Sequence, residues 1–396
     1  MTTKPALIRP FNGVLPPRDK AHLVATRSYL TYTDDELQDK LSRNPFSYMH
    51  VIHPHGVQSP HGADMAPVRR AFECFVDRGW LVRDTAPHFY LMQQESRHGV
   101  VTGIVALVDT GAAAKGQVKA HEATLAARET LFARYLEQVG LNAEPTLLAH
   151  DPLPELTEAC ARRMTGRPDL DFTTTDRVRH TLWKVPEADG DLAPLLSQIP
   201  ALYIADGHHR VASSRQLSLA HPDHPGAQHF MALLVPGDQL VFRGYHRRLV
   251  NADGQWAWVD AVAAIEALPE VQCLNLDAPL PSGTVELQLR GAADHRLAVA
   301  LEPGSLTLPE WLQDRVFAPI FGIHAPRTDR RLRCLTQAEH DRTPVPECEL
   351  AFLLPPLDFR QMKSAADAGR HMPPKSTWIA PKLRSGLALY DFGPAV

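Results

Sequence analysis

The sequence predicts an α+β protein with a mixed-sheet core, several hairpins and a smaller peripheral module. Short apolar runs such as 100–108 and 201–205 are typical of buried strands. The stretch 67–79 places apolar residues on one helical face and is typical of an amphipathic helix. Strands and helices alternate irregularly, and several strands follow one another as hairpin pairs. This order favours an α+β fold over a regular doubly wound one.

The individual elements follow from their periodicity and from residues that start or stop them. Thr33 is expected to cap the helix at 34–41, and Asn44-Pro45 ends it. The predicted helices cover 34–41, 67–79, 125–139, 155–164, 192–199, 211–217, 256–267, 309–317 and 358–368. The predicted single strands or strand regions cover 48–53, 145–150, 172–186, 201–205 and 348–354. The predicted hairpins join 88–95 to 99–108, 229–235 to 239–250, 284–289 to 295–301, and 378–381 to 387–392.

The composition changes near 252 and again near 345, which suggests how the chain is divided. We expect a core domain over 1–251 and a peripheral α+β module over 252–345, which contains a hairpin that alternates towards solvent. The remaining segment, 346–396, has a core-like pattern again and is expected to return to the core. A chain of 396 residues is long enough for two or three domains.

Composition excludes several functional classes. The net charge of −4 and the lack of a basic tract argue against a nucleic-acid partner. The apolar runs are too short to span a membrane, and the N-terminal stretch lacks a signal-peptide core. Five scattered cysteines without a Cys-x-x-Cys pair argue for reduced thiols. We therefore expect a cytoplasmic protein without a membrane partner; a homodimer is kept open.

The turn Asp206-Gly207-His208-His209-Arg210 lies where a predicted buried strand gives way to a helix. A helix N-terminus favours an anion such as phosphate, and Gly207 allows the backbone to approach it closely. Arg210 can hold a phosphate or carboxylate with two parallel hydrogen bonds. Asp206 can cap the helix, orient a histidine or bind a metal ion. The structural alternative is an N-cap aspartate followed by two surface histidines.

His121 and Glu122 stand side by side at the expected start of the helix at 125–139. Leu125 occupies the position of the second histidine in a His-Glu-x-x-His motif, so a zinc-protease site is excluded. The pair can serve as a base with its orienting partner, or as a magnesium ligand with a hydrogen-bonding neighbour. Equally, Glu122 and Thr124 can serve only to begin the helix.

Near the C-terminus, two prolines precede Lys375, Ser376 and Thr377, and Lys382 follows. The glycine-rich lead of a Walker A loop is missing, yet two lysines beside a polar loop can neutralise phosphate charge. A solvated turn before the last hairpin is the alternative. We expect eight residues to converge on one pocket: His121, Glu122, Asp206, His208, His209, Arg210, Lys375 and Lys382.

Together these motifs resemble the family of domain of unknown function 1015, over nearly the whole chain. The resemblance rests on three motifs that occur in the same order: Lys119 to Thr124, Ala205 to Arg210, and Met372 to Thr377 with Lys382. The resemblance implies a ParB/sulfiredoxin-like element. The Asp-Gly-His-His-Arg turn is similar to that of free-serine kinases, where it contacts nucleotide phosphates. The implied activity is nucleotide-dependent phosphoryl transfer to a small hydroxyl-bearing molecule.

The resemblance also implies roles for residues. Glu122, His121, Asp206 and His209 would be catalytic, with Glu122 accepting the substrate proton. Gly207, His208, Arg210, Lys375, Ser376, Thr377 and Lys382 would bind ATP or ADP, and Asp206 and Glu122 would hold Mg²⁺. Ser28-Tyr29-Leu30 lacks the acid that the family often carries near its N-terminus. A non-catalytic nucleotide-binding regulatory module therefore stays open, as does a metal-dependent hydrolase using His121, Glu122, His208 and His209.

Overall fold

The structure is a computed structural model that describes residues 6–28, 31–54, 64–251, 253–275, 277–291, 293–302 and 304–395. Tyr29 and Leu30, and most of the loop 54–64, lie outside the described residues. The chain forms two compact units. Unit 1 comprises Met1–Lys119, Thr124–Leu240 and Pro381–Val396, and unit 2 comprises Ala120–Ala123 and Val241–Ala380. Among the described helices, none is long and apolar enough to cross a membrane.

Unit 1 is built on a mixed sheet, and this confirms the predicted α+β class. Its nine strands within the described residues lie in the order β6-β11-β8-β12-β5-β4-β10-β9, with β1 paired to β5. β6 is parallel to β11 and β8 is parallel to β12, whereas the other pairs are antiparallel. The strands are β1 Ile8–Arg9, β4 His88–Ser96, β5 Gly99–Asp109, β6 Val118–Lys119, β8 Thr146–His150, β9 Leu170–Thr173, β10 Arg179–Pro186, β11 Leu202–Asp206 and β12 His229–Pro236.

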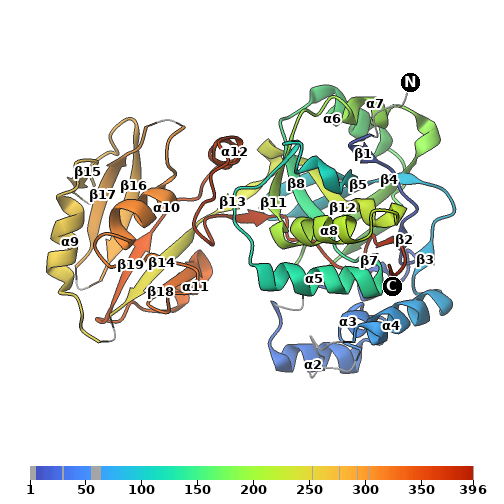
Figure 1. The fold of residues 1–396 in the computed structure, drawn as a ribbon, viewed down its shortest axis with the longest axis horizontal. Coiled ribbons are helices and arrows are strands. Elements are labelled where there is room, and N and C mark those ends of the chain that lie inside the picture. The colour runs from blue at the N-terminus through green and yellow to red at the C-terminus, as the bar shows by residue number, and fades with distance from the viewer. Residues whose placement is uncertain are drawn as a thin grey trace. The chain divides into compact units, whose positions relative to one another are not determined.

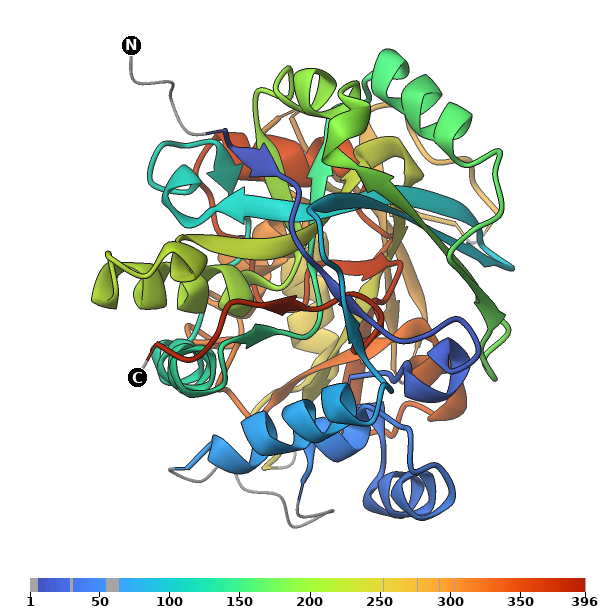
Figure 2. The ribbon, with the colours of Figure 1, turned by 90° about the vertical axis from the view of Figure 1, so that its right-hand side faces the viewer.

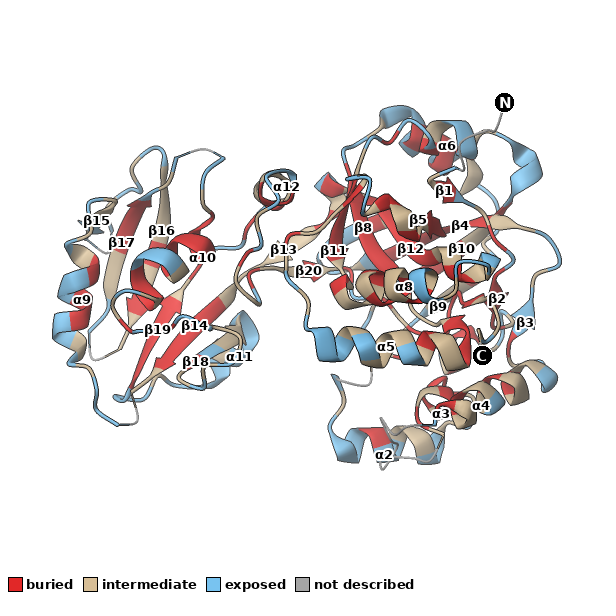
Figure 3. Cartoon of the chain, viewed as in Figure 1, coloured by how far each residue is buried: buried red, intermediate tan, exposed pale blue. Residues whose placement is uncertain are grey.

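Helix α8 lies against β8 and β12, and α5 packs along α8 (Figure 1). The helices of this unit are α1 Ala21–Val24, α2 Asp34–Arg43, α3 Met49–Ile52, α4 Ala66–Asp77, α5 Ala126–Val139, α6 Pro154–Arg163, α7 Leu192–Leu196 and α8 His208–Ala220. The short strands β2 Val14–Leu15 and β3 Val82–Arg83 pair, as do β7 Leu141–Asn142 and β21 Tyr390–Asp391. Figure 2 shows the C-terminal segment, in dark red, beside β7. Figure 3 shows that β8, β11 and β12 are largely buried.

Unit 2 has a six-stranded antiparallel sheet within the described residues, in the order β15-β17-β16-β19-β14-β18. The strands are β14 Tyr245–Val250, β15 Val271–Leu274, β16 Thr284–Arg290, β17 His295–Ala300, β18 Leu332–Thr336 and β19 Glu349–Leu353, and β13 Val241–Arg243 pairs with β20 Trp378–Ala380. The helices are α9 Trp258–Glu266, α10 Leu308–Trp311, α11 Gln337–Arg342 and α12 Phe359–Asp367; a π-helical turn, Leu312–Phe317, follows α10. Aromatic and aliphatic side chains from α9, α10, this π-turn and the sheet form one core.

Many local expectations are confirmed. Thr33 forms a capping box with Glu36 at the start of α2, and Asn44 is its C-cap. Val68, Phe72 and Phe75 form the buried face of α4, and β4 and β5 form the predicted hairpin. The borders of the compact units fall at Leu240 and Ala380, and Ala120–Ala123 joins unit 2. The division at 252 and 345 remains a prediction about which parts fold as domains.

Three expectations are wrong. The segment 48–53 contains the helix α3 and no strand. A single helical turn is too short to show whether its apolar residues repeat with the period of a helix or with that of a strand. The hairpin expected at 229–250 does not form: β12 pairs with β5 and β8, whereas β14 pairs with β18 and β19. The hairpin expected at 378–392 does not form either, since β20 pairs with β13 and β21 with β7. In both cases neighbours distant in sequence replace the local partner.

Candidate functional site

The predicted turn Asp206 to Arg210 joins β11 to α8 in unit 1. The pairing of β11 with β8 shifts register between Ile204 and Asp206, and such an irregularity changes the direction in which a strand end presents its side chain. Gly207 follows with φ 102° as the N-cap of α8. An added Cβ there would lie 2.8 Å from Nε and Nη2 of Arg210, so only glycine leaves room for the guanidinium to fold over the turn.

Four charged side chains meet at this turn. Arg210 forms ion pairs with Glu144 and Asp206, the second at 3.3 Å from Nη2 to Oδ2. Lys382 Nζ lies 3.3 Å from Asp206 Oδ1. The Ser385 hydroxyl donates to Glu144 Oε2 at 3.2 Å. The C-terminal segment therefore supplies a cation and a hydroxyl to a turn that lies far away in sequence.

The charges at the turn maintain one another in ionised form. Burial raises the pKa of Asp206, but the charges of Lys382 and Arg210 outweigh it and hold this pKa below its usual range. Burial lowers the pKa of Arg210, but Glu144 and Asp206 together raise it. Arg210 Nε is buried and has no hydrogen-bond partner among the described residues. Asp206 does not cap α8, contrary to one of the roles considered for it, because its carboxylate is engaged by the two cations.

The two histidines of the turn lie in the first turn of α8. His208 is buried. His209 Nε2 accepts a hydrogen bond from the backbone N–H of Leu125, the N-cap of α5, at 3.1 Å. His209 therefore joins the starts of the two packed helices, a structural contact that the sequence did not indicate.

In unit 2, the stretch Ala120–Ala123 runs beside the loop that precedes β20. Glu122 forms a parallel bridge with Met372, whose N–H donates to His121 O at 2.8 Å. His121 is buried, and its Nε2 lies 3.3 Å from Thr377 Oγ1. Glu122 Oε1 pairs with Arg327 Nη2 at 3.2 Å. The helix expected at 125–139 is confirmed as α5, which begins at Ala126, so His121 and Glu122 lie on the non-helical segment that precedes it and not in its first turn.

The loop containing Lys375 adopts a backbone that its sequence does not favour. Lys375 has φ 59°, in the left-handed region that a non-glycine residue seldom occupies. Its ammonium lies 5.3 Å from the centroid of the Tyr245 ring. The carbonyl oxygens of Pro374 and Lys375 each accept a bond from the buried Arg247 at 3.1 Å. Ser376 is buried, and its hydroxyl donates to Pro373 O at 2.6 Å.

The structure thus divides the predicted site residues into two groups, each within one unit. Asp206, Gly207, His208, His209, Arg210 and Lys382 belong to unit 1, whereas His121, Glu122, Lys375, Ser376 and Thr377 belong to unit 2. The convergence of both groups on one pocket remains a prediction. Sequence reasoning missed Glu144, Arg247 and Arg327. Two consecutive arginines inside the strand pattern of β14 were the one available signal for Arg247.

Metal binding at the predicted site depends on which ligating side chains gather there. Within the described parts of the chain, no three His, Cys, Asp or Glu side chains gather in a way that could hold a metal ion. Asp206 and Glu122, the two predicted magnesium ligands, are each paired with a cation. A magnesium ion at either residue would therefore need oxygen ligands from a bound phosphate or from water.

Comparisons with known proteins identify a family and a set of distant folds. The family profile "Protein of unknown function (DUF1015)" matches residues 8–316. No curated protein matches the chain. A C-terminally truncated SbnI from Staphylococcus aureus is 10% identical, with a TM-score of 0.41 over 70% of this chain and 82% of that one. A free serine kinase in complex with AMP is 12% identical, with a TM-score of 0.38 over 72% and 90% of the two chains. A conserved hypothetical protein from Pyrococcus furiosus is 12% identical, with a TM-score of 0.35 over 72% and 95%.

Proposed function

Because this chain belongs to the DUF1015 family, whose description assigns no activity, we propose a function from the site itself: nucleotide-dependent phosphoryl transfer to a small hydroxyl-bearing molecule. The observation that carries the proposal is the β11–α8 turn. There, Asp206 lies between Arg210 and Lys382, at a helix N-terminus whose N-cap residue, Gly207, has no side chain. Positioning and charge neutralisation are what phosphoryl transfer mainly requires.

ATP or ADP phosphates would lie at the N-terminus of α8. The first-turn backbone of a helix and its dipole favour an anion, and Gly207 brings that backbone close to a ligand. Arg210 would contribute its guanidinium, of which Nε makes no hydrogen bond to the described residues. Lys382, about half exposed, would contribute its ammonium. Both cations are paired with carboxylates now, so phosphate binding exchanges one anion for another.

Asp206 would be the magnesium ligand of this turn. Mg²⁺ in nucleotide sites is held by one or two carboxylates together with phosphate oxygens and water. The low pKa of Asp206, which Lys382 and Arg210 maintain against burial, keeps the carboxylate available as an oxygen ligand. Asp206 would hold the ion at this turn, and the charge of the ion would neutralise part of the phosphate charge.

We assign proton acceptance to Glu122 of unit 2. In the proposed step, the substrate hydroxyl oxygen bonds to the terminal phosphorus while the bond to the bridging oxygen breaks. The nucleotide leaves with that oxygen, and the hydroxyl proton passes to the Glu122 carboxylate. His121, Lys375, Ser376 and Thr377 would orient and neutralise; the contact of His121 with Thr377 links the two motifs that contain them.

Calorimetric titration of ATP and ADP, with and without magnesium, tests the binding part. Arg210→Ala should lower nucleotide affinity by about tenfold to a hundredfold, because it removes a charge-assisted contact. Arg215→Ala, further along the same helix, is the control and should bind normally. Affinity is compared per folded molecule, since Arg210 also holds Glu144 and Asp206. Unchanged affinity in Arg210→Ala would contradict a phosphate site at this turn.

Glu122→Gln tests the chemical part. It keeps the shape of the side chain, so binding should survive, whereas turnover should fall by about two to four orders of magnitude.

A second candidate function is a nucleotide-binding regulatory module without turnover. The ion pair of Glu122 with Arg327 favours it, because that carboxylate already has a partner. Nucleotide binding without phosphoryl transfer to any hydroxyl compound would select this candidate.

A further inference from the structure

A cavity of about 200 Å³ lies in unit 1, between helix α6 and the strands β5 and β12. Leu156 and Cys160 of α6 form one wall, and Ile104 and Leu234 of the sheet form the other. Thr157 and Ala161, one helical turn apart on α6, are exposed at its edge. The cavity therefore has an apolar floor and opens beside one face of α6.

His150, the last residue of β8, supplies a buried polar group to this cavity, whose lining also includes Thr102, Thr157 and Gln239. The residue is only 2% exposed. Its Nδ1 lies 2.8 Å from the carbonyl oxygen of Asp151, which can only accept, so Nδ1 carries the proton. Burial lowers the pKa of His150, although Asp151 and Asp238 act in the opposite direction, so the ring is neutral near pH 7. Nε2 is then an acceptor, and none of the described residues donates a hydrogen bond to it.

The chemistry of the lining selects the kind of ligand. All the lining residues are described, and none of them is Asp, Glu, Lys or Arg. A charged ligand would lose its hydration without gaining an ion pair. An uncharged molecule with one hydroxyl or N–H group would gain apolar burial and could satisfy His150 Nε2.

We propose that this cavity is a binding site for a small, uncharged, largely apolar molecule that donates one hydrogen bond to His150. An apolar cavity of about 150 Å³ holds benzene, so this one accepts a ligand with a single ring and one or two substituents. The site is separate from the proposed nucleotide turn. Asp206 pairs with Leu147 near the start of β8, and His150 ends that strand, about 10 Å further along it.

The test compares three one-ring probes by calorimetry or ligand-observed NMR on the full chain. Phenol has the ring and the donor, toluene lacks the donor, and benzoate carries a charge. Phenol should bind at least about fivefold more tightly than toluene, the usual effect of one neutral hydrogen bond, and benzoate should not bind. Equal binding of phenol and toluene, or preferential binding of benzoate, would overturn the proposal. So would no binding of phenol at millimolar concentration.

Two variants localise the effect. His150→Asn keeps an N–H that can reach Asp151 O but removes the acceptor nitrogen, so phenol should lose its advantage over toluene. Ala161→Phe places a ring at the cavity edge and should abolish binding of both probes. Glu158→Phe adds the same ring to an exposed position of α6 outside the lining and is the control. If His150→Asn fails to fold, Ala161→Phe against Glu158→Phe still decides: equal phenol binding by these two would refute the site.

Discussion

The β11–α8 turn of unit 1 and the Lys375 loop of unit 2 each contain a residue with positive φ, and an arginine stabilises each of them in a different way. In unit 1 the positive φ falls on Gly207, and the cation above it, Arg210, is held by the carboxylates of Glu144 and Asp206. In unit 2 the positive φ falls on Lys375, and the buried Arg247 holds the loop by its backbone carbonyls. The first cluster is an arrangement of side chains on a relaxed backbone. The second is a strained backbone fixed by one side chain.

This difference indicates where each cluster can change when it binds a ligand. The Arg210 side chain is 30% exposed and that of Asp206 is 39% exposed, so both can exchange partners with an incoming anion. Arg247 is 3% exposed, and its hydrogen bonds cannot be replaced by water without opening the structure. We therefore regard the unit 1 turn as the adaptable cluster and the Lys375 loop as the preformed one.

The largest effect is expected from Arg247→Met. It leaves the carbonyls of Pro374 and Lys375 without their charged donor and should lower the free energy of unfolding by about 3 kcal/mol. Arg210→Met, the matched change in unit 1, should cost only about 1 kcal/mol, because the Arg210 side chain and its partner Asp206 are 30% and 39% exposed and water can replace their contact. Urea denaturation of the full chain measures both. Equal losses would remove the distinction between the two clusters.

The sequence predicted the local parts of this arrangement better than the distant ones. The strand–turn–helix at Asp206 follows from an apolar run, a glycine and a helical pattern, all within one stretch. By contrast, Glu144 beside Arg210 and Arg247 behind Lys375 depend on pairings between segments far apart in the chain. An isolated Glu-Pro or an Arg in a strand pattern carries no local signal of its partner. The failed hairpins at 229–250 and 378–392 have the same cause.

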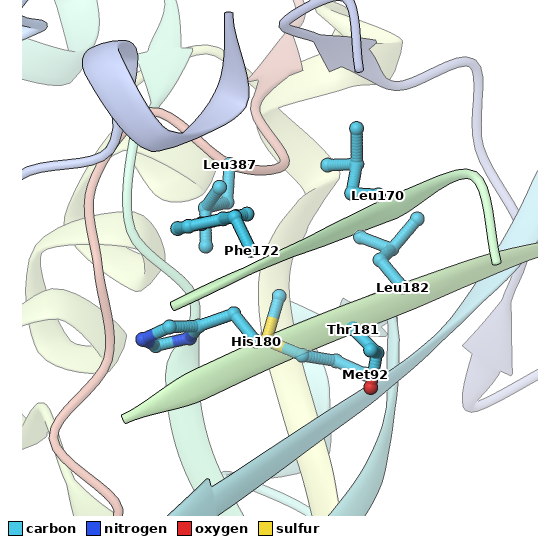
Figure 4. A pocket seen from close by; sticks show the side chains of 7 residues that line it. All are labelled: Met92, Leu170, Phe172, His180, Thr181, Leu182 and Leu387. Carbon is cyan, nitrogen blue, oxygen red and sulfur yellow. The ribbon is translucent and has the colours of Figure 1, made fainter. Parts of the chain in front are cut away.

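The second comparison concerns buried histidines. His180 in unit 1 is stacked on Phe172, and neither ring nitrogen has a hydrogen-bond partner in the described residues. Figure 4 shows both side chains in the pocket that Met92 and Leu387 also line. In unit 2, by contrast, Nε2 of His246 contacts Gln337 and Nδ1 accepts from Leu354 N–H. Burial, with a smaller effect of Arg384, lowers the pKa of His180 to about 4.

This pKa predicts acid destabilisation with a definite sign. The unfolded chain takes up the His180 proton below about pH 6.5, whereas the folded chain takes it up only near pH 4, so the unfolded state binds more protons in this window. The contribution of His180 to the free energy of unfolding is therefore fully present above about pH 6.5, and about 3 kcal/mol of it is lost as the pH falls to 4. His180→Phe should remove this part of the pH dependence, whereas His22→Phe, at an exposed position, should not. Identical acid limbs for wild type and His180→Phe would refute the assignment.

Gly207→Ala should cost about 2 kcal/mol, because it forces an alanine to φ 102° and moves the Arg210 guanidinium away from its carboxylates. The two contributions can be separated by a double-mutant cycle. In an Arg210→Ala background only the backbone strain remains, so Gly207→Ala should cost less there. If the losses in the free energy of unfolding were strictly additive, the close approach of the guanidinium to Gly207 would make no contribution to stability.

The smallest effect is expected at Lys375, and its sign is opposite to that at Gly207. A non-glycine residue in the left-handed region costs about 1 kcal/mol, which glycine avoids, although glycine gains about 0.5–1 kcal/mol of entropy in the unfolded chain. Lys375→Gly should therefore change stability by less than about 1 kcal/mol. Lys375→Ala keeps the strained backbone and loses the contact of the ammonium with Tyr245, so it is the matched reference. Denaturation midpoints should place Lys375→Gly at or above Lys375→Ala. If alanine were clearly the more stable of the two, Arg247 would not be holding strain in this loop, and the contrast with the relaxed Gly207 turn would fail.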